Sequence, residues 1–206
     1  MFRFLKEFKN KNEIKRQRAK KGYSWYDLCD IDEFFQTTFV NMIREFEENK
    51  ISYPELQFEE VESFEVAWVN EQFAEIVEPI KKSKWFDNCS EEDFDEYSIK
   101  DPYIRWRLVL RRIAYCLEQT SEELCSEVNE YQEEYFDKKF GHIKCIDDLF
   151  IPNEDNPKLY KLNTKEVSKK LERKFEKRQK EIEKYKIKMK NEAFNLISKY
   201  FFNLIY

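Results

Sequence analysis

The chain has 206 residues and a formal net charge of −5; 38% of its residues are charged, 41% are hydrophobic, and only two are glycine. Folds with many tight turns need glycine where φ is positive, so this composition argues against β-rich and doubly wound folds and favours an all-α fold. No run approaches the roughly 18 apolar residues of a membrane span, and the N-terminus lacks the apolar core of a signal peptide, so we expect a cytoplasmic protein without a membrane span.

The first expected element is a basic helix over residues 2–21, ended by Gly22. Ser24 and Asp27 then form a capping box, so a second helix begins there or near Asp32. The apolar stripe of this second helix consists of Ile31, Phe35, Phe39, Met42, Ile43 and Phe46. Its helical spacing predicts that one face of the helix is buried.

A third helix is expected after the interruption at Tyr53-Pro54. It should bend or end near Pro79, because proline lacks the backbone N–H that a helix interior requires. Its apolar stripe consists of Val61, Phe64, Trp68, Phe73, Ile76 and Ile80. Residues 83–100 are acidic and aromatic without a clear period, and we expect them to form a loop.

A fourth helix is predicted from Asp101 as N-cap and Pro102 as first helical residue. Its stripe consists of Trp106, Leu110, Ile113 and Leu117. Thr120 and Glu123 form another capping box, which predicts a fifth helix that ends at Gly141. The stripe of this fifth helix consists of Leu124, Val128, Tyr131 and Tyr135. The short connection predicts that the two helices form an antiparallel hairpin.

Residues 142–163 contain two prolines and a polar cluster, which favours a loop. From Thr164 onward there is no glycine or proline, which predicts one long C-terminal helix. Its basic first half is expected to be partly exposed or broken, and its apolar last turns, from Ala193, to pack into the core. In total we expect a helical bundle of about five to seven helices.

Charge is segregated along the chain. Residues 1–21 form a basic N-terminal arm with nine basic and two acidic side chains, and residues 22–160 form an acidic helical body with 14 and 34. Residues 161–206 form a basic end with 14 basic and six acidic side chains. The length suits a single domain over residues 1–206, on which the C-terminal helix docks by its last turns.

Candidate catalytic and metal-binding residues are few. His142 is the one histidine, and its H-x-x-C spacing to Cys145 provides two ligands without a closed metal site. Asp27, Asp30 and Asp32 form a small acidic cluster that helix capping explains.

A second acidic set leaves one enzymatic alternative open. Glu127, Glu130, Glu134 and Asp137 would share one face of a single helix, as in helical magnesium-dependent nucleotide hydrolases. A solvated acidic face is the plainer interpretation, because the surrounding region is already strongly acidic. Apart from this alternative we expect no cofactor, no metal and no enzymatic activity.

Exposed charges and aromatics supply the binding candidates. The segment 83–100 offers Trp85, Phe86, Phe94 and Tyr97 as anchors for a protein partner. The basic C-terminal helix offers Lys169, Lys170, Arg173, Lys177 and Arg178 as contacts for the phosphates of a nucleic acid or a signal nucleotide. The alternative is that the basic helices dock on the acidic body or remain solvated.

A family resemblance lies in the stretch Gly22-Tyr23-Ser24-Trp25-Tyr26-Asp27-Leu28-Cys29-Asp30-Ile31-Asp32. It resembles a G-Y-S-x-x-D…D stretch in small helical proteins of tailed bacteriophages and prophages, with Cys29 where that group commonly has tryptophan. The C-terminal segment containing Tyr200 and Phe201 is similar to the group's K-Y-F-x-x-L-W ending, with Ile205 in place of the last tryptophan. The resemblance implies a phage origin and a place in the host bacterial cytoplasm; it implies no chemistry, because the group's function is unassigned.

Both matching stretches are rich in large aromatic side chains. Tyr23, Trp25 and the cluster Tyr200-Phe201-Phe202 would bury large areas, so we expect them to meet in one core.

The function favoured by these observations is macromolecular binding by a phage accessory protein. Its partner would be a host or phage protein, for example a component of a host defence system or of nucleic-acid processing, and the acidic body would supply charge complementarity. The open alternatives are the metal-dependent nucleotide hydrolase and a nucleic-acid or signal-nucleotide binder that uses the basic ends. The sequence leaves the oligomeric state open.

Overall fold

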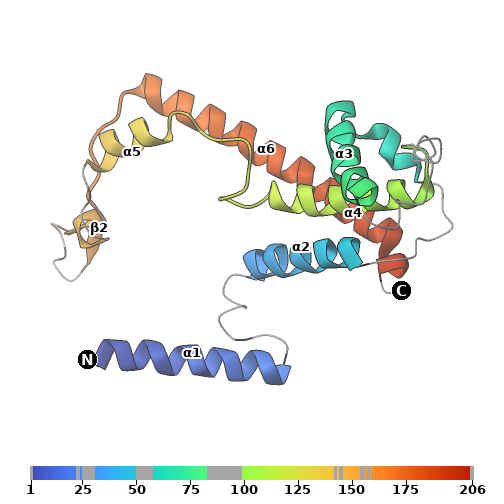
Figure 1. The fold of residues 1–206 in the computed structure, drawn as a ribbon. Helices are drawn as coiled ribbons and strands as arrows, with labels where there is room; N and C mark the ends of the chain where they lie inside the picture. Colours follow the sequence, from blue (N-terminus) through green and yellow to red (C-terminus); the bar gives the residue numbers. More distant parts are fainter. Residues whose placement is uncertain are drawn as a thin grey trace. The chain divides into compact units, whose positions relative to one another are not determined.

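The computed structural model describes residues 2–21, 24, 31–49, 58–82, 99–141, 143, 146–153, 156 and 159–204. Within these residues the α-helices are α1 (Phe2–Lys21), α2 (Ile31–Asn49), α3 (Val66–Lys82), α4 (Pro102–Glu118), α5 (Gln132–Phe140) and α6 (Lys169–Tyr200) (Figure 1). The shorter elements are the 3₁₀ helices η1 (Glu59–Ser63), η4 (Ile146–Leu149) and η5 (Phe201–Leu204) and the strands β1 (Phe150–Pro152) and β2 (Tyr160–Leu162). The predicted all-α class with a long C-terminal helix is confirmed.

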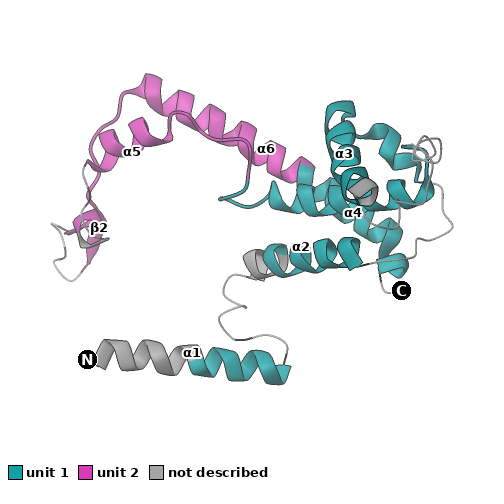
Figure 2. Cartoon of the chain, in the orientation of Figure 1, with its two compact units in different colours: residues 1–124, 189–206 teal, residues 125–188 magenta. Residues whose placement is uncertain are grey.

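The contacts of the chain group into two compact units (Figure 2). Unit 1 contains residues 1–124 and 189–206, and unit 2 contains residues 125–188. Helix α6 contributes its residues up to 188 to unit 2 and its remaining residues to unit 1. That the two units form one domain stays a prediction.

Helix α4 supplies much of the core of unit 1. Ten of its 17 residues are buried, and α2, α3 and η1 all contact it. The predicted stripe is confirmed, since Trp106, Leu110, Ile113 and Leu117 are all at most 2% exposed. The predicted start is confirmed as well, because the Asp101 carboxylate accepts a hydrogen bond from the backbone N–H of Tyr103 at 2.8 Å and Pro102 begins the helix.

The last turns of α6 pack into unit 1, as predicted. The side chains of Met189, Ala193, Leu196 and Tyr200 are buried at helical spacing. The ring of Tyr200 lies 5.5 Å from Phe58 and 5.6 Å from Trp106, between ring centroids, and these two rings are 5.5 Å apart. Three aromatic side chains therefore close the core where α4 meets the end of α6.

The expectation that the whole cluster 200–202 is buried is wrong. Phe201 is 51% exposed and Phe202 is 75% exposed, while Tyr200 is buried. Tyr200 takes the inward position, so the next two residues along the helical path point away from the core. Tyr23 and Trp25 lie outside the described residues.

Helix α2 begins at Ile31, close to the predicted start near Asp32. Its buried side chains include Val40, Ile43 and Glu47, whereas Met42 is 59% exposed. Including Met42 in the buried stripe was wrong, because Ile43 already faces the core and adjacent residues lie about 100° apart around a helix.

The predicted third helix is divided in two. The chain forms η1, and Phe64 then adopts extended backbone at φ −76° and ψ 156°, which places its side chain in the core before α3 begins at Val66. Helix α3 also passes Pro79 and ends at Lys82. Only three helical residues follow Pro79, so the hydrogen bond that proline cannot donate to the carbonyl of Glu75 is lost near the C-terminal end of the helix.

The first half of the predicted fifth helix, residues 120–131, is not helical. The Thr120 hydroxyl donates to the carbonyl of Leu117 at 2.6 Å instead of capping a following helix. The predicted core residues Leu124 and Val128 are 59% and 67% exposed. Helix α5 begins only at Gln132, so its connection to α4 is not short, and the basis for the predicted hairpin is wrong.

The end of α5 is as predicted. The helix stops at Phe140, and Gly141 has a φ of +73°, which favours glycine over any residue with a side chain. The predicted loop over residues 142–163 contains η4 and an antiparallel hairpin in which Phe150 pairs with Leu162 and Pro152 with Tyr160. Strands of three residues are too short for an alternating pattern to reveal them.

Helix α6 starts five residues later than predicted and is unbroken to Tyr200. The Ser168 hydroxyl accepts a hydrogen bond from the backbone N–H of Leu171 at 3.4 Å, so Ser168 acts as the N-cap. No helix in the described part of the chain combines the length and the apolarity of a membrane span.

Candidate functional sites

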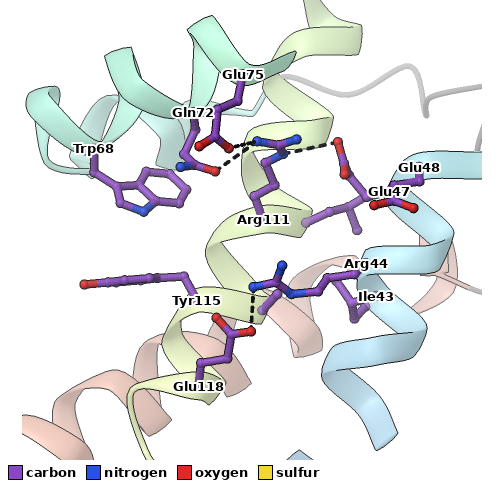
Figure 3. A pocket seen from close by; sticks show the side chains of 12 residues that line it. Ile43, Arg44, Glu47, Glu48, Trp68, Gln72, Glu75, Arg111, Tyr115 and Glu118 are labelled. Carbon is purple, nitrogen blue, oxygen red and sulfur yellow. Dashed lines mark hydrogen bonds and ion pairs between the residues drawn. The ribbon is translucent and has the colours of Figure 1, made fainter. Parts of the chain in front are cut away.

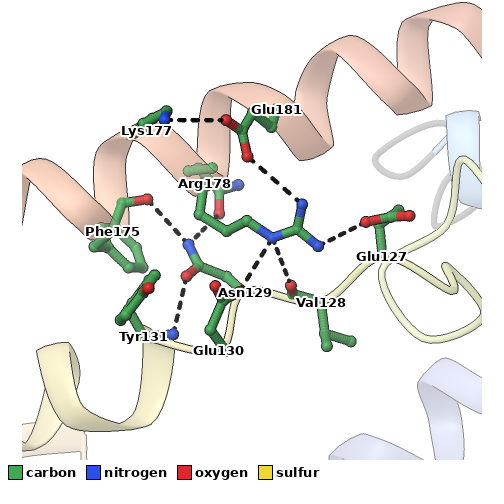
Figure 4. Close-up of polar contacts among 10 residues, drawn as sticks. Glu127, Val128, Asn129, Glu130, Tyr131, Phe175, Lys177, Arg178 and Glu181 are labelled. Atoms are coloured by element: carbon green, nitrogen blue, oxygen red, sulfur yellow. Dashed lines mark hydrogen bonds and ion pairs between the residues drawn. The ribbon is translucent and has the colours of Figure 1, made fainter.

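Arg178 on α6 is the centre of a polar cluster in unit 2 (Figure 4). Its Nη2 atom lies 2.6 Å from a carboxylate oxygen of Glu127, and its Nε atom lies 3.1 Å from both a carboxylate oxygen of Glu130 and the carbonyl oxygen of Val128. The hydrogen bond to Glu127 is the largest influence that raises the pKa of Arg178. One cation thus holds the irregular segment before α5 against α6.

Neighbouring contacts hold the same segment. The Asn129 side chain donates to the carbonyl of Phe175 at 3.1 Å and accepts from the backbone N–H of Tyr131 at 3.1 Å. The rings of Tyr135 and Phe175 stack in parallel with their centroids 4.1 Å apart. This inner face of α6 is therefore used for packing within unit 2.

These contacts contradict the prediction that four acids share one face of a helix. Glu127 and Glu130 precede α5 and form ion pairs with Arg178, while Glu134 forms an ion pair with Lys138 at 2.5 Å. Only Glu134 and Asp137 lie on the helix, so the four acids do not share one helical face. In the ranges that the structure describes, no group of three or more His, Cys, Asp or Glu side chains is placed to hold a metal ion.

The outward face of α6 in unit 2 carries a row of cations, which we call the cationic stripe. It consists of Lys169, Arg173, Lys177, Lys180 and Lys184, all of them exposed. At 100° per residue these five positions lie within a sector of about 80° and extend over about 22 Å along the helix. Lys177 lies 3.9 Å from Glu181, and the other four have no ion pair among the described residues.

The predicted phosphate contacts are divided between the two faces of α6. Lys169, Arg173 and Lys177 belong to the cationic stripe, and Lys170 is exposed at its edge. Arg178 faces inward and forms ion pairs with Glu127 and Glu130, so it does not belong to the cationic stripe, and its role in partner binding stays a prediction. Lys180 and Lys184 were missed, although their spacing from Arg173 and Lys177 would have placed them on the same face.

The structure describes only a few of the other predicted site residues. Ser24 is buried. Asp32 lies in the first turn of α2. The remaining predicted residues, which lie outside the described residues, are Gly22, Tyr23, Asp27, Asp30, Trp85, Phe86, Phe94, Tyr97, His142 and Cys145.

A pocket of about 300 Å³ opens between α2, α3 and α4 in unit 1 (Figure 3). Its apolar lining is formed by Ile43, Leu110 and Ala114 and its aromatic lining by Trp68 and Tyr115. Its polar lining is formed by Arg44, Glu47, Glu48, Gln72, Glu75, Arg111 and Glu118. The sequence did not indicate this pocket, because its residues come from three helices and form no local motif.

Both arginines of the pocket are held by neighbouring acids. An Nη atom of Arg111 lies 2.7 Å from Glu75 and 3.1 Å from the side-chain oxygen of Gln72, and its Nε atom lies 3.3 Å from Glu47. Arg44 forms an ion pair with Glu118 at 2.5 Å. Figure 3 shows the Arg111 guanidinium between the acids of α2 and α3.

No protein-family model, curated protein or solved structure matches the chain. Because no relative indicates a function, function is inferred from two features of the structure, the cationic stripe and the pocket.

Proposed function

We propose that this chain is an accessory protein that acts by binding a macromolecule, and that the partner is a nucleic acid bound along the cationic stripe. The observation that carries the proposal is the row of exposed cations from Lys169 to Lys184 on one face of α6. Cations arranged in this way neutralise successive phosphates and release the counterions condensed on the nucleic acid.

The composition of the stripe favours phosphate over a protein surface. The cores of protein interfaces are enriched in aromatic residues and depleted in lysine. Four of the five stripe residues are lysine, and the outward sector between Lys169 and Lys184 contains no apolar side chain. Lysine binds phosphate as a point charge, without the planar fork by which arginine recognises a guanine edge, so we expect binding with little sequence preference.

The acids of unit 2 do not remove this positive charge. Glu127 and Glu130 are bound to Arg178 on the inner face of α6. Glu181 is shared between Arg178 and Lys177 and lies beside the stripe. Glu176 and Glu183 are exposed along the opposite edge of the stripe, so a partner that approaches this face meets five cations flanked by acids.

The phage origin is a further part of the proposal. It is supported by the resemblance at Gly22-Tyr23-Ser24 and at the aromatic C-terminus. A phage protein that covers nucleic acid in the host cytoplasm would oppose host enzymes that process or destroy it. A nuclease-protection assay tests this role: with the protein present, a duplex should be digested more slowly by a nuclease, and unchanged digestion would contradict it.

Binding itself is tested by fluorescence anisotropy with a labelled 20-nucleotide single strand, a labelled 20-base-pair duplex and labelled polyglutamate. We expect both nucleic acids to bind at low salt with a dissociation constant that rises steeply with salt concentration. Polyglutamate of equal charge should bind more weakly than the duplex, because its carboxylates are more widely spaced. Tighter binding of polyglutamate would favour an acidic protein partner, and no binding of nucleic acid at 50 mM salt would contradict the proposal.

A further inference from the structure

The pocket between α2, α3 and α4 has a charge and a lining that the nucleic-acid proposal does not use. We propose that it binds a small organic cation, namely an amine or amidine carried on an apolar body. The pocket lies in unit 1 and the cationic stripe in unit 2, so the two proposals rest on different residues.

The charges of the pocket are in excess on the acidic side. Two arginines and four glutamates line it, so its formal charge is −2. Arg107, just outside the lining, also forms an ion pair with Glu47, which leaves an excess of one carboxylate. That surplus is Glu48, which lines the pocket, is exposed and has no ion pair among the described residues. A cation that enters the pocket gains a carboxylate partner without breaking an existing pair.

The same arrangement disfavours an anion. Arg44 and Arg111 already donate to Glu118 and Glu75 at 2.5 and 2.7 Å. A phosphate or carboxylate ligand would have to displace these acids and would add negative charge to a site that already has an excess of it. The arginines therefore organise the walls of the pocket and are not free to recognise an anion.

The remaining lining suits the apolar part of such a ligand. Ile43, Leu110 and Ala114 are buried side chains that line the pocket, and the Trp68 and Tyr115 rings, 5.8 Å apart between centroids, line it as well (Figure 3). Small-molecule sites are typically concavities of this size or larger. Most of the accessible lining of this pocket is polar, so the apolar part of a ligand would be small and would contact only these side chains. An aryl or alkyl body would contact the rings while its charged end faces Glu48.

Three probes of similar size and different charge test the inference: benzamidine, benzyl alcohol and benzoate. Binding is followed by NMR on the full chain, using the backbone amide resonances of α2, α3 and α4. We expect saturable shifts with benzamidine, weaker shifts with benzyl alcohol and none with benzoate. Benzoate binding as tightly as benzamidine would overturn the inference, and so would the absence of any shift with benzamidine in the millimolar range.

A matched pair of variants locates the charge. Glu48→Gln removes the surplus carboxylate without breaking an ion pair of the described residues, and it should weaken benzamidine binding about two- to five-fold, as expected for an exposed charge pair. Glu45→Gln makes the same change on α2 outside the pocket and should leave the affinity unchanged. Equal affinities of the two variants would overturn the assignment. Nucleic-acid binding should be the same in both variants, so failure of one proposal is distinguishable from failure of the other.

Discussion

The guanidinium of Arg112 donates a hydrogen bond to the carboxylate of Glu192 at 2.6 Å, and this ion pair between a buried cation and a partly exposed acid links α4 to the end of α6. A second carboxylate, that of Glu65, lies 2.7 Å from the same guanidinium. The rings of Phe64, Trp68 and Tyr115 surround it with centroids 5.2 to 5.4 Å from its central carbon. Burial alone would lower the pKa of Arg112, but hydrogen bonding to Glu192 and Glu65 raises it above its ordinary value.

Replacement of Arg112 should therefore be among the most damaging changes in unit 1. Arg112→Met removes the cation from two carboxylates that are 25% and 57% exposed, so we expect the loss typical of hydrogen bonds to a charged group, about 1.5–3 kcal/mol in the free energy of unfolding. The control is Arg16→Met, which breaks an ion pair with Glu13 whose side chains are 77% and 41% exposed; it should cost much less, because exposed ion pairs contribute little to stability. Urea denaturation measures both, and equal losses would contradict the buried role of Arg112.

The hydroxyl of Tyr200 gives a second test of how α6 is held. It donates to a carboxylate oxygen of Glu60 at 2.5 Å, and burial followed by the hydrogen bond to Glu60 raises the pKa of Tyr200. Tyr200→Phe removes a hydrogen bond to a charged group and should cost about 1.5–3 kcal/mol in the free energy of unfolding. Tyr160→Phe, on an exposed ring, should cost nothing measurable in the same urea titration.

The same contact predicts a dependence on pH. Burial alone would raise the pKa of Glu60, but hydrogen bonds from Lys199 and Tyr200 lower it below the ordinary value of 4.5. A carboxylate with a lowered folded-state pKa stabilises the fold above its unfolded pKa and loses this contribution as the pH falls through the folded pKa. The stability difference between the native chain and Tyr200→Phe should therefore be constant near pH 7 and shrink below about pH 4.5. A difference that grows in acid would contradict this sign.

The two described cysteines should differ in reactivity. Cys116 is fully buried, and burial raises the pKa of its thiol to about 12, whereas Cys125 is partly exposed. Because the thiolate is the reactive form, iodoacetamide at pH 8 should label Cys125 well before Cys116 in the folded chain. Peptide mapping by mass spectrometry measures which cysteine is labelled first. The two cysteines should be labelled at comparable rates only after unfolding in urea.

Local chemistry made some elements predictable. The Asp101-Pro102 pair predicts the start of α4 because an N-cap acceptor and a fixed φ are both encoded within two residues. Gly141 likewise predicts the end of α5, since its positive φ is unfavourable for other residues. The apolar stripe of α4 was predictable because its four large apolar residues recur at helical spacing, although the helix buries more of its surface than this stripe covers.

Where two local interactions compete, the sequence pattern predicted the wrong local structure. Thr120 and Glu123 match a capping box, but the Thr120 hydroxyl turns back to Leu117 and the chain stays irregular until Gln132. The inward position of Arg178 depends on Glu127 and Glu130, which lie about 50 residues earlier in the sequence. Such long-range partners are not encoded in the spacing of α6, and the same holds for the pocket, whose walls come from three helices.

The central claim, that the cationic stripe binds nucleic acid, is tested most directly by two double variants of α6 with equal charge. Lys180→Gln with Lys184→Gln removes two stripe residues, whereas Lys186→Gln with Lys190→Gln removes two cations from the same helix outside the stripe sector. The measurement is the slope of log affinity for a 20-base-pair duplex against log salt concentration. We predict that the stripe variant loses about 1.8 from this slope, since each phosphate contact contributes about 0.9, and that the control retains the native slope. Equal slopes and affinities for the two variants would contradict the account.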